Sequence, residues 1–122
     1  MAESYLELTK LEQLKVQVGE AMFPTLLGLF KQELNEYRDQ LTGGDAEQIG
    51  RICHAIKGSA PSFGAKPLTQ LATEMDLLFK SGRKEELQQQ VPQLLEMLNN
   101  TEQGVKTYCS CSTMASRNLS RS

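Results

Sequence analysis

Residues 45–64 read DAEQIGRICHAIKGSAPSFG, and this segment predicts an amphipathic helix with defined ends. Asp45 is a suitable N-cap, with Gln48 three residues later in the capping-box position. Gly64 is a suitable stop, because glycine readily adopts the left-handed conformation that ends many helices. The apolar residues recur at three- and four-residue steps and share one helical face: Ile49, Ile52, Cys53, Ile56, Ala60 and Phe63.

The sequence on both sides of this segment predicts more helices to cover that face. A sustained alternation of β-branched and polar residues, the signal of strands, is absent. Helical periodicity is strong, and it is interrupted by glycine and proline. We expect four further helices, with these approximate bounds: Thr9 to Gly19, Pro24 to Gly43, Pro67 to Ser81 and Lys84 to Val105.

Two local signals refine these helices. Thr9 and Glu12 have the spacing of a capping box, so the first helix should begin at Thr9. Pro92 lies inside the last segment and should kink or divide it, because proline lacks the N–H that a helix interior needs.

The helices together predict an all-α fold, an antiparallel four-helix bundle with a short extra helix at the N-terminus. The bundle domain should span residues 1–105, which is long enough for one continuous core. Residues 106–122 are rich in serine, lack acidic residues and show no period. We expect them to form a disordered tail, either a natural extension or a sequence appended to the domain.

Composition excludes several classes of protein. The net charge of −2 argues against a general nucleic-acid binder. The chain has no apolar run near the roughly 20 residues of a membrane span, and its first residues lack a secretory signal. Three cysteines, an odd number, fit a reducing compartment, so we expect a cytoplasmic protein. The sequence does not fix the oligomeric state, and a monomer is the default expectation. Cys109 and Cys111 form a C-x-C pair, but with one histidine in the chain we expect no metal site.

That one histidine, His54, falls roughly 160° from the apolar centre of its helix, on the outer face. Residues three and four positions away share this face: Gly50, Arg51, Lys57 and Gly58. Two cations therefore flank the imidazole, and two positions carry no side chain. A functional site that another protein must approach closely would have this form. The alternatives are an incidental surface histidine and two tolerated helix glycines.

The residue types suit phosphoryl transfer. A neutral imidazole is a good nucleophile near neutral pH and can form a covalent intermediate by attacking phosphorus. The reaction otherwise needs alignment and neutralisation of oxygen charge. Lys57, one turn away, is a candidate for the second task; Arg51 is another candidate, or a solvated cation.

The segment HAIKGSA at residues 54–60, followed by SFGA at residues 62–65, resembles the phosphorylation motif of histidine-containing phosphotransfer (HPt) domains. The resemblance covers most of the chain and implies that His54 carries the phosphoryl group. It matches Lys57 to the cationic position and Gly58 to a close-approach glycine. Asp76 matches a position on the next helix that hydrogen-bonds the imidazole in many members. Helical periodicity places Asp76 at the edge of the apolar face, and a solvated helix residue is the alternative.

The resemblance also implies the partners. His54 would accept phosphate from an aspartate of the receiver domain of a hybrid sensor kinase and pass it to the receiver domain of a response regulator. The receivers would bring Mg²⁺, and this chain would bind no cofactor. The sequence lacks a G-x-x-x-x-G-K-S/T loop, so we expect a phosphocarrier without kinase or ATPase activity of its own. A helical adaptor that docks receivers without being phosphorylated is the alternative. The sequence is equally consistent with a stand-alone protein and with a module of a hybrid kinase.

Overall fold

The computed structural model describes the backbone of residues 6–121 and the side chains through Tyr108. This part of the chain contains helices and no strand, as predicted. The elements, in chain order, are α1 (Leu8–Val18), α2 (Phe23–Leu41), α3 (Ala46–Ser59), the short 3₁₀ helix η2 (Ala60–Phe63), α4 (Lys66–Lys80), α5 (Lys84–Gln89) and α6 (Val91–Arg121).

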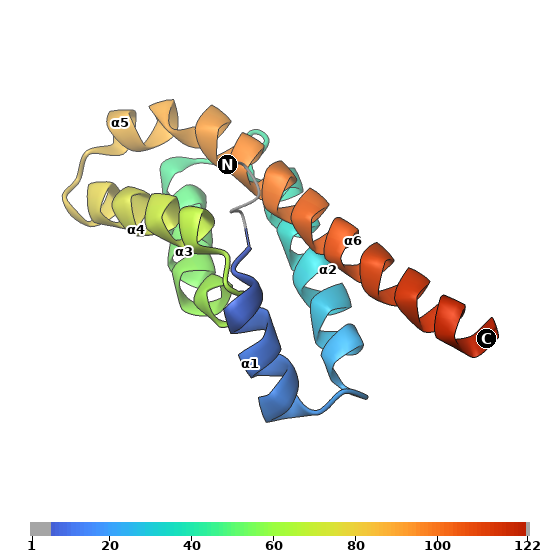
Figure 1. Cartoon of the computed structure of the whole chain (residues 1–122). Coiled ribbons are helices and arrows are strands. Elements are labelled where there is room, and N and C mark those ends of the chain that lie inside the picture. Colours follow the sequence, from blue (N-terminus) through green and yellow to red (C-terminus); the bar gives the residue numbers. More distant parts are fainter. Residues whose placement is uncertain (1–5, 122) are drawn as a thin grey trace.

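Four of these helices form the predicted bundle (Figure 1). α3 packs along α4, and α2 packs along α6. The contacts of α2 with α3 and of α4 with α6 join the two pairs. α1 is the extra N-terminal helix and lies against η2 and α2. Among the described residues, no helix combines the length and the apolarity that a membrane span requires.

The predicted apolar faces meet in one core. Each bundle helix contributes side chains with at most 1% exposure. Leu78 and Phe79, which helical periodicity predicts in the core, are only partly buried at its edge. Ring stacking ties η2 to α2, since the rings of Phe30 and Phe63 lie 4.1 Å apart between centroids and nearly parallel. Four residues illustrate the fully buried set: Leu34, Ile56, Met75 and Leu98.

The predicted start at Asp45 and stop at Gly64 are confirmed, but the α-helix ends at Ser59 and the segment continues to Phe63 as the 3₁₀ helix η2. The side chain of Asp45 accepts a hydrogen bond from the backbone N–H of Gln48 at 2.9 Å. Gly64 has a φ of +72°, which L-residues with side chains rarely adopt. A Cβ atom on Gly64 would also lie 2.8 Å from the backbone oxygen of Glu7. Glycine is therefore required here both by the turn and by the close approach of the chain entering α1.

The prediction of a capping box at Thr9 is wrong. α1 begins at Leu8, with Glu7 as the N-cap and no side-chain capping bond. The backbone N–H of Glu7 instead donates to the oxygen of Gly64 at 2.8 Å. A tertiary hydrogen bond to the end of η2, rather than a local side chain, therefore positions the start of this helix.

Pro92 divides the last helical segment, as predicted. α5 ends at Gln89 and α6 begins at Val91, which places Pro92 in the first turn of α6. An N–H in the first turn has no partner within the helix, so its absence there breaks no bond.

The expectation that regular structure stops at Val105 is wrong. α6 continues to Arg121, and Figure 1 shows its last turns extending beyond the other helices. Tyr108 still contacts the bundle: its ring packs edge-on against Phe23 at a centroid distance of 6.1 Å. Its hydroxyl also donates to Glu12 at 3.3 Å. These contacts, with no glycine or proline after Gly104, favour continuation of the helix. The side chains of Cys109 and Cys111 lie outside the described residues.

Candidate functional site

His54 lies on the outer face of α3, where helical periodicity predicts it. Its side chain is 67% exposed, although its immediate neighbour Cys53 is fully buried. The alternation follows from the helical repeat, because consecutive residues differ by about 100° in direction. The imidazole is therefore attached to a rigid, well-packed helix and is open to an approaching partner.

Asp76 of α4 lies beside the imidazole and is not a solvated residue. Its exposure is 2%, and its Oδ1 atom is 3.8 Å from Nδ1 of His54. This distance is longer than a hydrogen bond but short enough for an electrostatic interaction. The carboxylate faces one ring nitrogen, Nδ1, which leaves Nε2 as the nitrogen free for chemistry.

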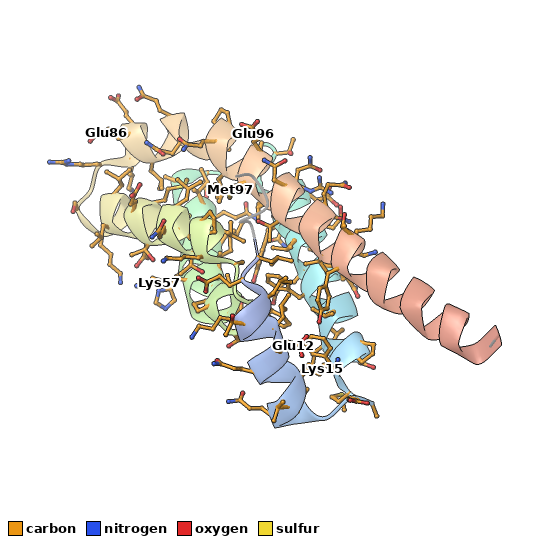
Figure 2. All side chains as sticks on the ribbon, viewed as in Figure 1. Glu12, Lys15, Lys57, Glu86, Glu96 and Met97 are labelled. Carbon is orange, nitrogen blue, oxygen red and sulfur yellow. The ribbon has the colours of Figure 1, made fainter. Side chains whose placement is uncertain are left out.

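Two lysines hold the other oxygen of this carboxylate. Lys57 donates from Nζ to Oδ2 of Asp76 at 2.9 Å, and Lys80 lies 3.0 Å from the same oxygen. Figure 2 shows Lys57 on the outer side of the α3–α4 pair, away from α2 and the C-terminal half of α6. The sequence motif includes Lys57 but not Lys80. The spacing of four residues between Asp76 and Lys80, which makes them neighbours on a helix, was the available signal.

The lysines control the ionisation of Asp76. Burial by itself would raise the pKa of this carboxyl group, because it penalises the charged form. The hydrogen bonds and charges of Lys57 and Lys80 act in the opposite direction and outweigh burial, so the pKa lies below its ordinary value of 3.8. Asp76 is therefore a carboxylate at neutral pH.

This lowered pKa predicts an acid-dependent part of the stability. A group whose pKa is lower in the folded state stabilises the fold fully above its unfolded pKa, and loses that effect as pH falls toward the folded value. We expect the free energy of unfolding, measured with urea, to fall as pH decreases below 3.8. The free energy of unfolding of the Asp76→Asn variant should fall less over this pH range. That of Asp39→Asn, which replaces an exposed carboxylate, should fall as much as in the original chain. Equal losses in all three proteins would contradict the assignment.

The two glycines of α3 differ, which corrects one expectation. Gly58 is exposed, and a Cβ atom there would meet nothing within 4 Å, as a surface for close approach requires. Gly50 is buried, and a Cβ atom there would lie 2.6 Å from Cγ of Phe79. We expected Gly50 on the open face beside His54, but it faces α4, because its direction lies between the open face and the apolar face of α3. Its role is helix packing.

Arg51 is exposed one turn before His54. Within the described residues, no ion pair or hydrogen bond links Arg51 to the cluster of His54, Lys57, Asp76 and Lys80. In the same part of the chain, no group of three or more histidine, cysteine, aspartate or glutamate side chains is placed to hold a metal ion. The cluster is thus one exposed imidazole, one buried carboxylate and two ammonium groups.

The fold and the site together define a class of protein. The four-helix bundle presents an accessible histidine beside a cation and an open glycine, and residues 25–104 match the Hpt domain family. The chain therefore belongs to the HPt domain family and is a histidine phosphotransfer protein of a two-component phosphorelay.

Within this family the chain is similar to the phosphorelay protein LuxU of several Vibrio species. It is 36% identical to LuxU of Vibrio cholerae over 103 residues, covering 81% of this chain and 91% of that protein. The identity to LuxU of Vibrio harveyi is 29% over 112 residues, covering 88% and 98% respectively. LuxU of Vibrio vulnificus is 33% identical over 98 residues, covering 77% and 85%. No solved structure gives a significant match.

Proposed function

We propose that His54 is the phosphorylated residue, and that it receives its phosphoryl group from an aspartate of one receiver domain and passes it to an aspartate of another. The observation that carries the proposal is the 67% exposed imidazole with Nδ1 directed at a buried carboxylate. This arrangement supplies an oriented and accessible nucleophile on a rigid helix.

The chemistry follows from the orientation of the ring. With the proton on Nδ1, next to Asp76, the lone pair of Nε2 lies on the side of the ring away from that carboxylate. Nε2 attacks phosphorus, the bond from phosphorus to the receiver's carboxylate oxygen breaks, and that oxygen leaves with the electron pair. The ring becomes positively charged, and Asp76, 3.8 Å from Nδ1, stabilises that charge. The reverse sequence of steps returns the phosphoryl group to a second receiver.

The partner domains would supply what this chain lacks. The sequence has no nucleotide-binding loop, so we propose a carrier that depends on a kinase for its phosphoryl group. The receivers would bring Mg²⁺ with their own acidic residues, and the open surface at Gly58 leaves room for them. We propose that the protein acts as a monomer in the cytoplasm, between a hybrid sensor kinase and a response regulator.

The test is a transfer assay. The chain is mixed with a receiver domain carrying ³²P-phosphoaspartate in the presence of Mg²⁺. The proposal predicts that the chain acquires a label that is labile in acid and stable in base, as a phosphoramidate bond is, and that a second receiver removes it. Binding of the receiver without transfer would instead indicate a docking adaptor.

Replacement of Lys57 tests the cation of the motif. We expect Lys57→Ala to slow transfer about tenfold, because the charge-assisted hydrogen bond that holds Asp76 beside the imidazole is lost. Asp76 keeps Lys80 as a partner at 3.0 Å, and the Lys57 side chain is 35% exposed, so the free energy of unfolding should fall by about 1 kcal/mol. A time course of ³²P transfer, quenched at successive times, gives the rate, and urea unfolding gives the stability. An unchanged rate would reduce Lys57 to a surface charge.

A further inference from the structure

The charge around Asp76 is unbalanced. Lys57 and Lys80, from two different helices, both lie within 3.0 Å of Oδ2 of the same carboxylate. With a neutral His54, one carboxylate and two ammonium groups leave one surplus positive charge beside the imidazole. A single cation neutralises Asp76, and the second is repelled by the first. One lysine is therefore held in this cluster without being required for neutralisation.

The surplus cation matches the charge that phosphorylation brings. A protein-bound phosphoryl group carries close to two negative charges at neutral pH, and its oxygens accept strong hydrogen bonds from ammonium groups. Without phosphate, the carboxylate is the best acceptor near the lysines. A phosphoryl group on His54 would be a stronger acceptor at the edge of the same cluster.

The exposures indicate which lysine can change partner. The side chain of Lys80 is 56% exposed, whereas that of Lys57 is 35% exposed. Lys80 is the last residue of α4, so its stem extends from a helix end into solvent. A lysine side chain has four flexible carbons and a compact charge, which suit such a movement.

We propose that Lys80 is a phosphoryl-binding residue that pairs with Asp76 in the unphosphorylated protein and moves to the phosphoryl oxygens when His54 is phosphorylated. Lys57 then remains with Asp76, and the carboxylate stays neutralised while it faces Nδ1. The exchange makes and breaks ion pairs only, and the covalent change is the transfer described above. This inference rests on the proposed function, and it adds a residue outside the sequence motif.

The first experiment compares Lys80→Gln, Lys80→Arg and Lys66→Gln. Lys66→Gln is the matched control, because it removes the same charge from an exposed site at the other end of α4. We expect Lys80→Gln to lower the equilibrium constant for transfer from a phosphorylated receiver about fivefold, Lys80→Arg to restore most of it, and Lys66→Gln to leave it unchanged. Equal constants for Lys80→Gln and Lys66→Gln would overturn the proposal.

The second experiment uses the unmutated chain and therefore does not depend on how the variants fold. Phosphoramidate is the phosphodonor: its P–N bond breaks, ammonia leaves, and no receiver is needed. NMR spectra of the lysine ε-methylene groups before and after phosphorylation should show a larger shift for Lys80 than for Lys66. If the protein is phosphorylated and the ε-methylene signal of Lys80 shifts no more than that of Lys66, the proposed role of Lys80 is overturned. Failure of the wild-type chain to be labelled by either donor would instead refute the proposed function.

Discussion

The His54→Gln variant should acquire no acid-labile phosphate from a phosphorylated receiver. Glutamine has no nucleophilic nitrogen, because the lone pair of its amide nitrogen is delocalised, so we expect a loss of at least about 1,000-fold in labelling. The side chain is 67% exposed, and its removal leaves the core untouched. Circular dichroism and urea unfolding should therefore match the original chain within about 0.5 kcal/mol.

Composition makes this experiment decisive. The chain contains one histidine, so a phosphohistidine label cannot move to another ring when His54 is replaced. Arg51→Gln, on an exposed position one turn away, is the control and should keep its label. Acid-labile label that persists in His54→Gln would show that the phosphoryl group resides elsewhere, and the carrier mechanism built on His54 would fail.

The Gly50→Ala variant should be clearly less stable than the original chain. Helix propensity alone favours alanine by about 0.5–1 kcal/mol. The new Cβ atom would lie 2.6–2.7 Å from three ring carbons of Phe79, so the ring or the α3–α4 contact must shift. Overpacking of this kind costs about 1–3 kcal/mol, and we expect a net loss of about 1–2 kcal/mol in the free energy of unfolding. Urea unfolding monitored by circular dichroism measures the loss.

Gly58→Ala is the matched substitution on the same helix, and its expected effects are opposite. The Cβ atom meets nothing within 4 Å, so the variant should be as stable as the original chain or more stable by about 0.5 kcal/mol. Transfer from the receiver should become slower, because the added methyl group occupies the surface that the partner approaches. Stabilisation by alanine at both positions would show that the ring of Phe79 moves aside without cost and that Gly50 has no packing role.

Much of the fold follows from local patterns. The three- and four-residue spacing of apolar side chains identifies the faces that meet in the core, and Asp45 and Gly64 mark where the α3 segment begins and stops. The same periodicity places His54 on the outside. These predictions succeed because a helix sets the direction of every side chain relative to its neighbours in sequence.

The errors concern contacts between elements. Thr9 has the spacing of a cap, yet Glu7 is the N-cap and α1 begins at Leu8, because the backbone N–H of Glu7 pairs with Gly64. The loss of periodicity predicts an end of order at Val105, yet Tyr108 still packs on Phe23. Each partner is remote in sequence, and local patterns carry no information about it.

The helical class, the outward position of His54 and the motif around Lys57 can all be read from the amino-acid sequence without coordinates. Two features of the site emerge only when the helices pack: Gly50 is covered while Gly58 stays open, and Lys57 of α3 meets the buried Asp76 of α4. The difference arises because helical periodicity fixes directions within one helix. The rotation and separation of α3 and α4 then determine which side chains meet, and those depend on the packing of the whole core.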